Sequence, residues 1–280
     1  MRHAVAPAVC GVLAIVVSLS TPPAHAGVVI DPIGWGLSPG DTFRVVVVTA
    51  GGTTGISASI ADYDAFVNSQ GLSGITYGGS SLSWQAIART PTSDPVGDGS
   101  RYSSAANATH IYNLNGLRVS GTVNGSAFWQ TTGYNQHTAA IDWTIDGSGN
   151  RAQVGAFQLV WTGFDWDGAA TTANAFDSSG FPVGTVTAVL SQAVDYTGYD
   201  YGTNAPVPAT LYPAVGRAGA LANGWASIDN KPLASVYSLY AMSELITVMA
   251  VPEPSALALA AAGAFGIAAA WSSRRARGGR

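Results

Sequence analysis

Several residue types that build common functional sites are scarce in this sequence. The chain contains one cysteine, Cys10, one lysine, Lys231, and two glutamates, Glu244 and Glu253. No cysteine follows residue 10, which excludes disulfides, a thiol nucleophile and cysteine metal ligands from everything downstream. A domain of this length does not need disulfides, because it can bury an adequate core without them.

Cations are also few between residues 27 and 250. Arg and Lys number seven there against fifteen Asp and Glu, which gives this segment a net charge of −8. Affinity for a phosphate backbone depends on clustered cations, so we expect no nucleic-acid partner. The segment has only two histidines, His110 and His137, and their spacing matches no zinc motif.

The first twenty-six residues have the three parts of a secretory signal peptide. Arg2 and His3 precede an apolar region over residues 4–19, and Ala24 and Ala26 supply small residues before Gly27. This pattern predicts that residues 1–26 are a signal peptide that is cleaved between Ala26 and Gly27.

The C-terminal thirty residues hold a second targeting pattern. It begins with Val251, Pro252, Glu253, Pro254 and Ser255. The next residues, 256–271, carry no charge, and with Ser272 and Ser273 they predict a transmembrane helix over 256–273. The tail 274–280 contains four arginines, which the positive-inside rule places in the cytoplasm: Arg274, Arg275, Arg277 and Arg280.

The order of proline-acid-proline motif, short apolar span and arginine cluster resembles the PEP-CTERM sorting signal of Gram-negative bacteria. This resemblance implies recognition by an exosortase, a membrane protease, and cleavage near residues 251–255. The protein would be exported, held briefly in the inner membrane, and delivered to the cell surface or extracellular matrix. An ordinary C-terminal anchor is the alternative. The domain organisation is then signal peptide 1–26, secreted ectodomain 27–250 and sorting signal 251–280.

The ectodomain pattern predicts a β-rich domain with one early helix. A helix is expected over 59–67, with Ser59 as N-cap, Asp62 as capping-box acid and Gly71 after its end. Residues 169–227 read as loop-rich apart from one strand. Strands are expected from β-branched or alternating runs at 41–49, 83–88, 110–114, 117–119, 141–145, 157–163, 183–189, 235–243 and 245–249.

Three stretches carry a second resemblance. They are Ile-Tyr-Asn-Leu-Asn-Gly-Leu-Arg-Val at 111–119, Val-Trp-Thr-Gly at 160–163 followed by Asp167-Gly168, and Gly-Trp-Ala at 224–226 ahead of Ser-Leu-Tyr-Ala-Met-Ser at 238–243. This layout is similar to the C-type-lectin-like, endostatin-like fold. It implies an α+β, β-rich class, with a mixed sheet, an early helix and long loops in the second half. An all-β sandwich is the alternative. The chain lacks the paired disulfides and calcium triplets of true C-type lectins, so their sugar binding is not implied.

One acidic pair and a few aromatic residues are the candidate binding residues. Asp165 and Asp167 beside a glycine could share Ca²⁺, but the same residues suit a plain turn, and we expect a turn and no cofactor. Trp166, Tyr199 and Tyr201 are expected at the surface, where aromatic rings can contact sugars or proteins. Three other tryptophans are expected in the core: Trp143, Trp161 and Trp225.

Catalytic patterns are weak. No Gly-x-Ser-x-Gly elbow is present, and Glu244 is the only ectodomain glutamate available for glycosidase chemistry. We therefore expect a non-enzymatic structural or adhesive protein with no catalytic residues. A carbohydrate- or protein-binding module and a secreted hydrolase are the alternatives. The expected partners are an exosortase and, at the destination, exopolysaccharide or other matrix proteins.

Overall fold

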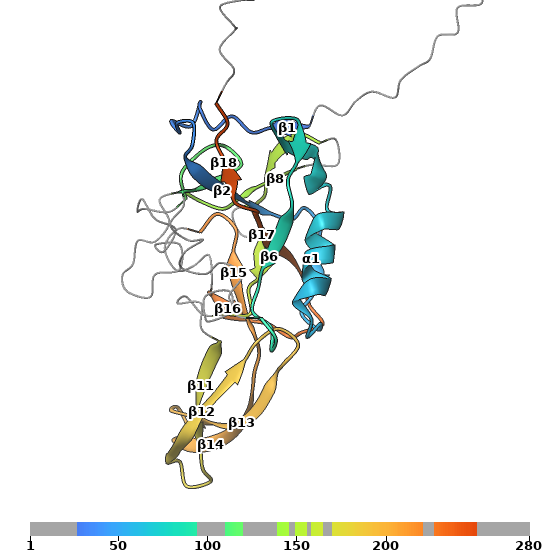
Figure 1. The fold of residues 1–280 in the computed structure, drawn as a ribbon. Helices are drawn as coiled ribbons and strands as arrows, with labels where there is room; N and C mark the ends of the chain where they lie inside the picture. Colours follow the sequence, from blue (N-terminus) through green and yellow to red (C-terminus); the bar gives the residue numbers. More distant parts are fainter. Residues whose placement is uncertain are drawn as a thin grey trace, which may run out of the picture.

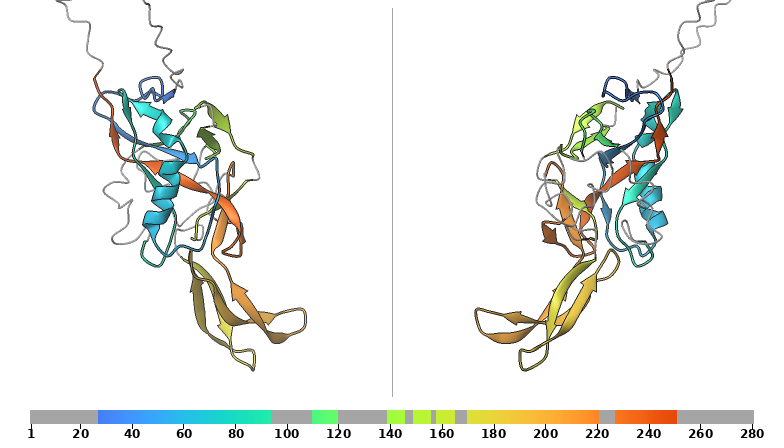
Figure 2. Two further views of the ribbon diagram at one scale, coloured as in Figure 1. Left: turned by 90° about the vertical axis from the view of Figure 1, so that its right-hand side faces the viewer. Right: turned by 60° about the vertical axis from the view of Figure 1, so that its left-hand side comes forward.

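A computed structural model of the chain describes residues 27–93, 110–119, 139–145, 149–155, 158–164, 170–220 and 227–250 (Figure 1). These residues form a body and an arm of β-hairpins that projects from it (Figures 1 and 2). The body contains α1 (Ile60–Ser69), a 3₁₀ turn (Leu72–Gly74), and the strands β1 (Val28–Val29), β2 (Thr42–Val48), β3 (Thr53–Thr54), β4 (Ile75–Tyr77), β5 (Ser80–Ser81), β6 (Trp84–Ile87), β7 (His110–Asn113), β8 (Trp143–Ile145), β9 (Arg151–Gln153), β10 (Leu159–Trp161), β15 (Ala214–Arg217), β16 (Asp229–Asn230), β17 (Val236–Ser243) and β18 (Ile246–Thr247). The arm contains β11 (Thr171–Phe176), β12 (Pro182–Ala188), β13 (Val194–Asp200) and β14 (Ala205–Leu211).

A mixed sheet built around β17 organises the body. The first half of β17 pairs with β10 in parallel and with β3 antiparallel, and its second half pairs antiparallel with β2 and β6. On its other side β2 pairs in parallel with β7. The strand closest to the C-terminus of the ectodomain is therefore central, so the body cannot close its sheet until that strand is in place.

Both faces of this sheet are buried. Along β2, Val45 and Val47 belong to one core cluster, and Val46 and Val48 belong to another. Tyr240 and Met242 of β17 likewise lie in the second cluster. Because successive side chains of a strand point to opposite faces, burial on both sides explains the continuous valine run of β2. A strand with one face in water would alternate instead.

Helix α1 lies beside β6 and is tied to it by polar side chains (Figure 1). Asp64 accepts a hydrogen bond from the Ala86 amide at 2.8 Å, and Asn68 donates to the Trp84 carbonyl at 2.8 Å. The predicted helix is confirmed, and Gly71 follows its end with φ +75°. The capping box is wrong, because Ser59 makes no side-chain cap and Asp62 accepts from the Ser57 hydroxyl instead.

The fold class expected from the sequence is wrong, although its β-rich content holds. The lectin-like resemblance implies long loops in the second half, but that half holds two regular hairpins, β11–β12 and β13–β14. The sandwich alternative does not describe the structure either, because a helix packs beside one mixed sheet. Within the described ranges no helix is long and apolar enough to span a membrane, and the helix expected at 256–273 lies outside them.

Candidate interaction surfaces

The arm consists of two antiparallel hairpins that pack against each other, with the Phe176 and Tyr199 rings 5.3 Å apart, and their turns point in different directions (Figure 2). The β11–β12 ladder has a bulge between Ala175 and Phe176, and bulges increase the local twist of a hairpin. The β13–β14 ladder runs without interruption from Val194 to Asp200. These elements occupy most of the stretch that the sequence presents as loop.

Prolines protect one outer edge of the arm. Pro206 and Pro208 lie within β14, opposite Tyr199 and Thr197, and the ladder continues through both positions. Because proline has no N–H, a continuous ladder requires that the backbone nitrogens of both prolines point away from β13. The outer edge of β14 therefore lacks two donors that a further strand would need, which blunts its tendency to aggregate.

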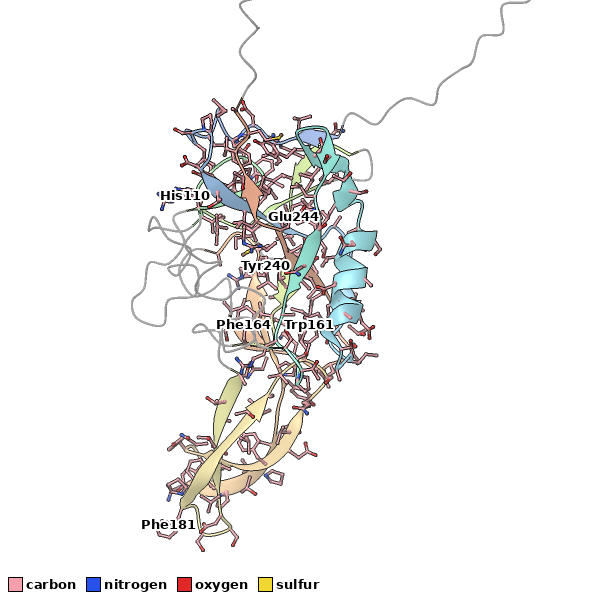
Figure 3. All side chains as sticks on the ribbon, viewed as in Figure 1. His110, Trp161, Phe164, Phe181, Tyr240 and Glu244 are labelled. Atoms are coloured by element: carbon pink, nitrogen blue, oxygen red, sulfur yellow. The ribbon has the colours of Figure 1, made fainter. Side chains whose placement is uncertain are left out.

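The arm tips expose large apolar and aromatic side chains. Phe181 is 68% exposed, Val183 64% and Tyr201 81% (Phe181 is labelled in Figure 3). Tyr201 makes an edge contact with Tyr199, whose hydroxyl donates to Asn204 at 2.8 Å. The two tyrosines named from the sequence therefore lie together on one hairpin.

The β13–β14 turn is fixed by Asp200. Its carboxylate accepts hydrogen bonds from the Thr203 hydroxyl at 2.8 Å and from the Gly202 amide at 2.8 Å. These hydrogen bonds lower the pKa of the Asp200 carboxyl below its usual range, and the bond from the Thr203 side chain has the largest effect. The ionised Asp200 therefore holds the loop that presents Tyr201.

No lysine, arginine or histidine occurs between residues 170 and 211, whereas three aspartates do: Asp177, Asp195 and Asp200. Edge strands are often protected by lysine, and here that role falls to the prolines and carboxylates. The arm thus offers exposed apolar groups on a weakly acidic background.

The arm is joined to the body through Leu190, which lies between the two hairpins and is fully buried. It belongs to the same core cluster as Trp161 of β10. A Cβ added to Gly163 would come within 2.8 Å of the Leu190 side chain, so this glycine makes room for it. The Leu190 and Ser191 amides donate to the Arg89 and Gly55 carbonyls at 3.1 and 2.6 Å.

At the opposite end of the molecule, the described chain begins and ends at the same pole. Figures 1 and 2 show that the described chain begins near β1 and ends just after β18, at the end of the body away from the arm. The C-terminal end is held there by three hydrogen bonds. Val248 exchanges bonds with Gly40 and Asp41 at 2.8 Å each, and the Met249 amide donates to the Tyr77 hydroxyl at 2.7 Å.

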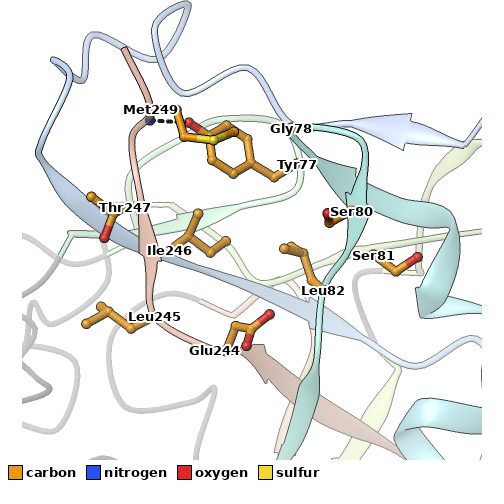
Figure 4. Close-up of a pocket in the computed structure, with 10 residues that line it drawn as sticks. All are labelled: Tyr77, Gly78, Ser80, Ser81, Leu82, Glu244, Leu245, Ile246, Thr247 and Met249. Atoms are coloured by element: carbon orange, nitrogen blue, oxygen red, sulfur yellow. Dashed lines mark hydrogen bonds between the residues drawn. The ribbon is translucent and has the colours of Figure 1, made fainter.

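A slot of about 270 Å³ opens beside this exit (Figure 4). It lies where two paired strands separate. The two strands are β6 and β17, and the last hydrogen bonds between them join Ser83 and Glu244. The chain before Ser83 belongs to the β4–β5 hairpin, whereas the chain after Glu244 continues along β2 as β18. The slot is lined by apolar and hydroxyl side chains and one carboxylate, with no cation: Tyr77, Gly78, Ser80, Ser81, Leu82, Glu244, Leu245, Ile246, Thr247 and Met249.

The other residues singled out from the sequence are distributed as follows. Trp161 is fully buried as expected, and Trp143 is half-buried against the core. In the described part of the chain no three His, Cys, Asp or Glu residues gather into a metal site. Gly27 is the first described residue. Outside the described residues lie Ala24, Ala26, Asp165, Trp166, Asp167, Trp225, the motif 251–255 and the arginines of 274–280.

Comparison with known proteins identifies the C-terminal segment. The family description of the PEP-CTERM protein-sorting motif matches residues 250–275. No curated protein and no solved structure matches the chain. The match confirms the sorting signal expected from Pro252, Glu253 and Pro254. The chain is therefore an exported surface protein of the class that exosortase, a membrane protease, sorts and processes.

Proposed function

We propose that this exosortase-sorted protein has a non-enzymatic, adhesive role at the cell surface or in the extracellular matrix, and that the two-hairpin arm is its contact element. The observation that carries the proposal is the position of the arm relative to the C-terminal end of the described chain. The arm lies at one end, and the segment that leads to the sorting motif leaves from the other (Figure 1). While the chain is held by its C-terminus, the arm points away from the point of attachment.

The chemistry of the tips supports a contact role. Phe181, Val183 and Tyr201 are each more than 60% exposed, so binding a partner would remove apolar surface from water. Aromatic side chains at such positions supply large, rigid contact area at a low cost in conformational entropy. The absence of cations from 170–211 disfavours acidic polymers and favours a protein or a neutral glycan as partner.

The position of Glu244 supports a role without catalysis. Glu244 is the only glutamate between residues 27 and 250, and its carboxylate accepts a hydrogen bond from the Ser83 amide at 3.2 Å. It thereby closes the end of the β6–β17 ladder. Glu244 acts here as a structural group.

Retention of the mature protein in the matrix fraction of its host tests the proposal. We expect Phe181→Ser with Tyr201→Ser to release the protein into the medium, because the double variant removes the two most exposed aromatic side chains among the described residues. Val29→Ser is the matched control, since Val29 is 65% exposed and lies at the opposite pole. The adhesive proposal is wrong if the arm variant and the control are retained equally.

The identity of the partner follows from the same experiment. If protease treatment of the matrix abolishes retention, the arm binds a protein. If glycan digestion abolishes retention, the alternative of a carbohydrate-binding module is correct. Turnover of a glycoside or ester panel, abolished by Glu244→Gln, would contradict the non-enzymatic role.

A further inference from the structure

The slot at the exit pole is bounded by two strand edges. Within the described residues, β5 is the last strand of the sheet β1-β4-β5, and β18 continues from β17 along the same edge of β2, with no strand paired to its other edge. The Ser83–Glu244 bonds close one end of the slot. The Tyr77–Met249 bond, drawn in Figure 4, closes the other. An exposed strand edge is a template on which an extended segment of another chain can pair.

The slot is shaped by local sequence. Gly78 and Gly79 form the tight turn between β4 and β5 with φ values of +59° and +82°, a conformation that glycine adopts without strain. The Met249 side chain fills the space where Gly78 lacks a Cβ, since an added Cβ would lie 2.1 Å from its terminal carbon. Leu245 and Met249 are 45% and 53% exposed, so apolar surface remains open along this wall.

Chain length places the sorting motif directly beside this surface. Among the residues that the structure describes, Met249 is the last with a hydrogen bond to the body, and Pro252 follows it by three residues in the sequence. Three residues span at most about 11 Å when fully extended. A small domain is about 30 Å across, so a protease that holds Pro252 in its active site must touch the exit pole.

We propose that the slot between β5 and β18 is the docking surface for the exosortase that processes this chain. The enzyme would insert an extended, predominantly apolar segment between the two strand edges, with its polar end toward Glu244. This inference rests on exosortase sorting and is independent of the adhesive role of the arm.

A variant on the wall farthest in sequence from the motif tests the proposal. Ser80 is exposed, lines the slot and lies outside the motif, so Ser80→Trp fills the slot without altering the sequence of the cleaved segment. Ser69→Trp on the exposed end of α1 is the matched control. In the native host, pulse-chase labelling should show Ser80→Trp precursor processed about tenfold more slowly, which corresponds to a loss of about 1.4 kcal/mol of docking free energy.

A spacer variant distinguishes loss of docking from failure of the Ser80→Trp protein to fold or be exported. A Gly-Ser linker of about twelve residues inserted after Ala250 has a mean reach of roughly 20 Å, which lets the protease hold the motif at a distance from the body. With the spacer, Ser80→Trp and wild-type precursors should be processed at equal rates. The proposal is overturned if Ser80→Trp and wild-type precursors are processed at equal rates without the spacer. It is also overturned if Ser80→Trp delays processing equally with and without the spacer.

Crosslinking provides a second readout that does not depend on a bulky substitution. A photo-reactive amino acid in place of Ser80 should crosslink the precursor to exosortase, whereas the same group in place of Ser69 should not. Crosslinking from neither site, or equally from both, contradicts a specific slot. A chain that is still processed after deletion of Val251–Ser255 would instead contradict exosortase sorting itself.

Discussion

Substitution of Leu190 by alanine tests whether the arm and the body fold as one unit. Leu190 is fully buried between the hairpins and the body, in the cluster that contains Trp161. The change removes three carbon groups, each worth about 0.8 kcal/mol when buried. The cavity left behind adds to this, because Gly55 and Gly163 line it and carry no side chains that could fill it. We therefore expect the free energy of unfolding to fall by about 3 to 4 kcal/mol.

Urea unfolding followed by tryptophan fluorescence measures this loss. Leu117→Ala is the matched control, because Leu117 is 53% exposed and should lose less than about 0.5 kcal/mol. Limited proteolysis adds a local readout, since cleavage within 170–211 should become faster in Leu190→Ala. A loss below about 1 kcal/mol would show that the cavity collapses or that the arm contributes little to the stability of the body, and would refute the anchoring role.

Three further outcomes are expected. Burial and the neighbouring Arg118 lower the pKa of His110 below 6.5. The unfolded chain therefore binds the proton more tightly, and the free energy of unfolding should fall as the pH drops below 6.5. In urea titrations, His110→Asn should lose less stability than the wild type between pH 7.5 and 5.5. Deleting Val251–Ser255 should leave unprocessed precursor in the membrane fraction, and mass spectrometry that finds residues 274–280 on the fully matured wild type would contradict processing. Excess chelator should leave the melting temperature unchanged, whereas a decrease that Asp167→Ala abolishes would assign Ca²⁺ to that turn.

Local patterns were sufficient to predict the elements that face the core. The β-branched run of β2 and the early helix α1 follow from periodicity and residue type. Between the segments expected as strands at 110–114 and 117–119 the chain turns at Gly116, with φ +78°, although the second segment forms only an isolated bridge between Arg118 and Tyr112. The sorting signal is also a local pattern, because a membrane and a protease read it as a linear segment.

The strand expected at 183–189 is confirmed as β12, but the other three strands of the arm were missed because their local signals conflict. The repeated glycines and the prolines at 206 and 208 read as loop, yet both prolines fit an outer edge where no ladder donor is needed. The alternation Val194, Tyr196, Gly198 was a signal for a strand, and Tyr201 to Asn204 marked its turn. The expected lectin-like class failed at this point, because it replaced the hairpins with loops.

The amino-acid sequence by itself determined that this protein carries two targeting segments, since these can be recognised from composition and order alone. It also determined that β2 is a buried strand, because a continuous apolar run is stable only away from water. Only the tertiary structure decided that β17 lies between β2 and β10, that both ends of the described chain leave from one pole, and that the arm lies at the other. These relations join residues as far apart as Tyr77 and Met249, and pairings over such separations depend on the packing of the whole domain.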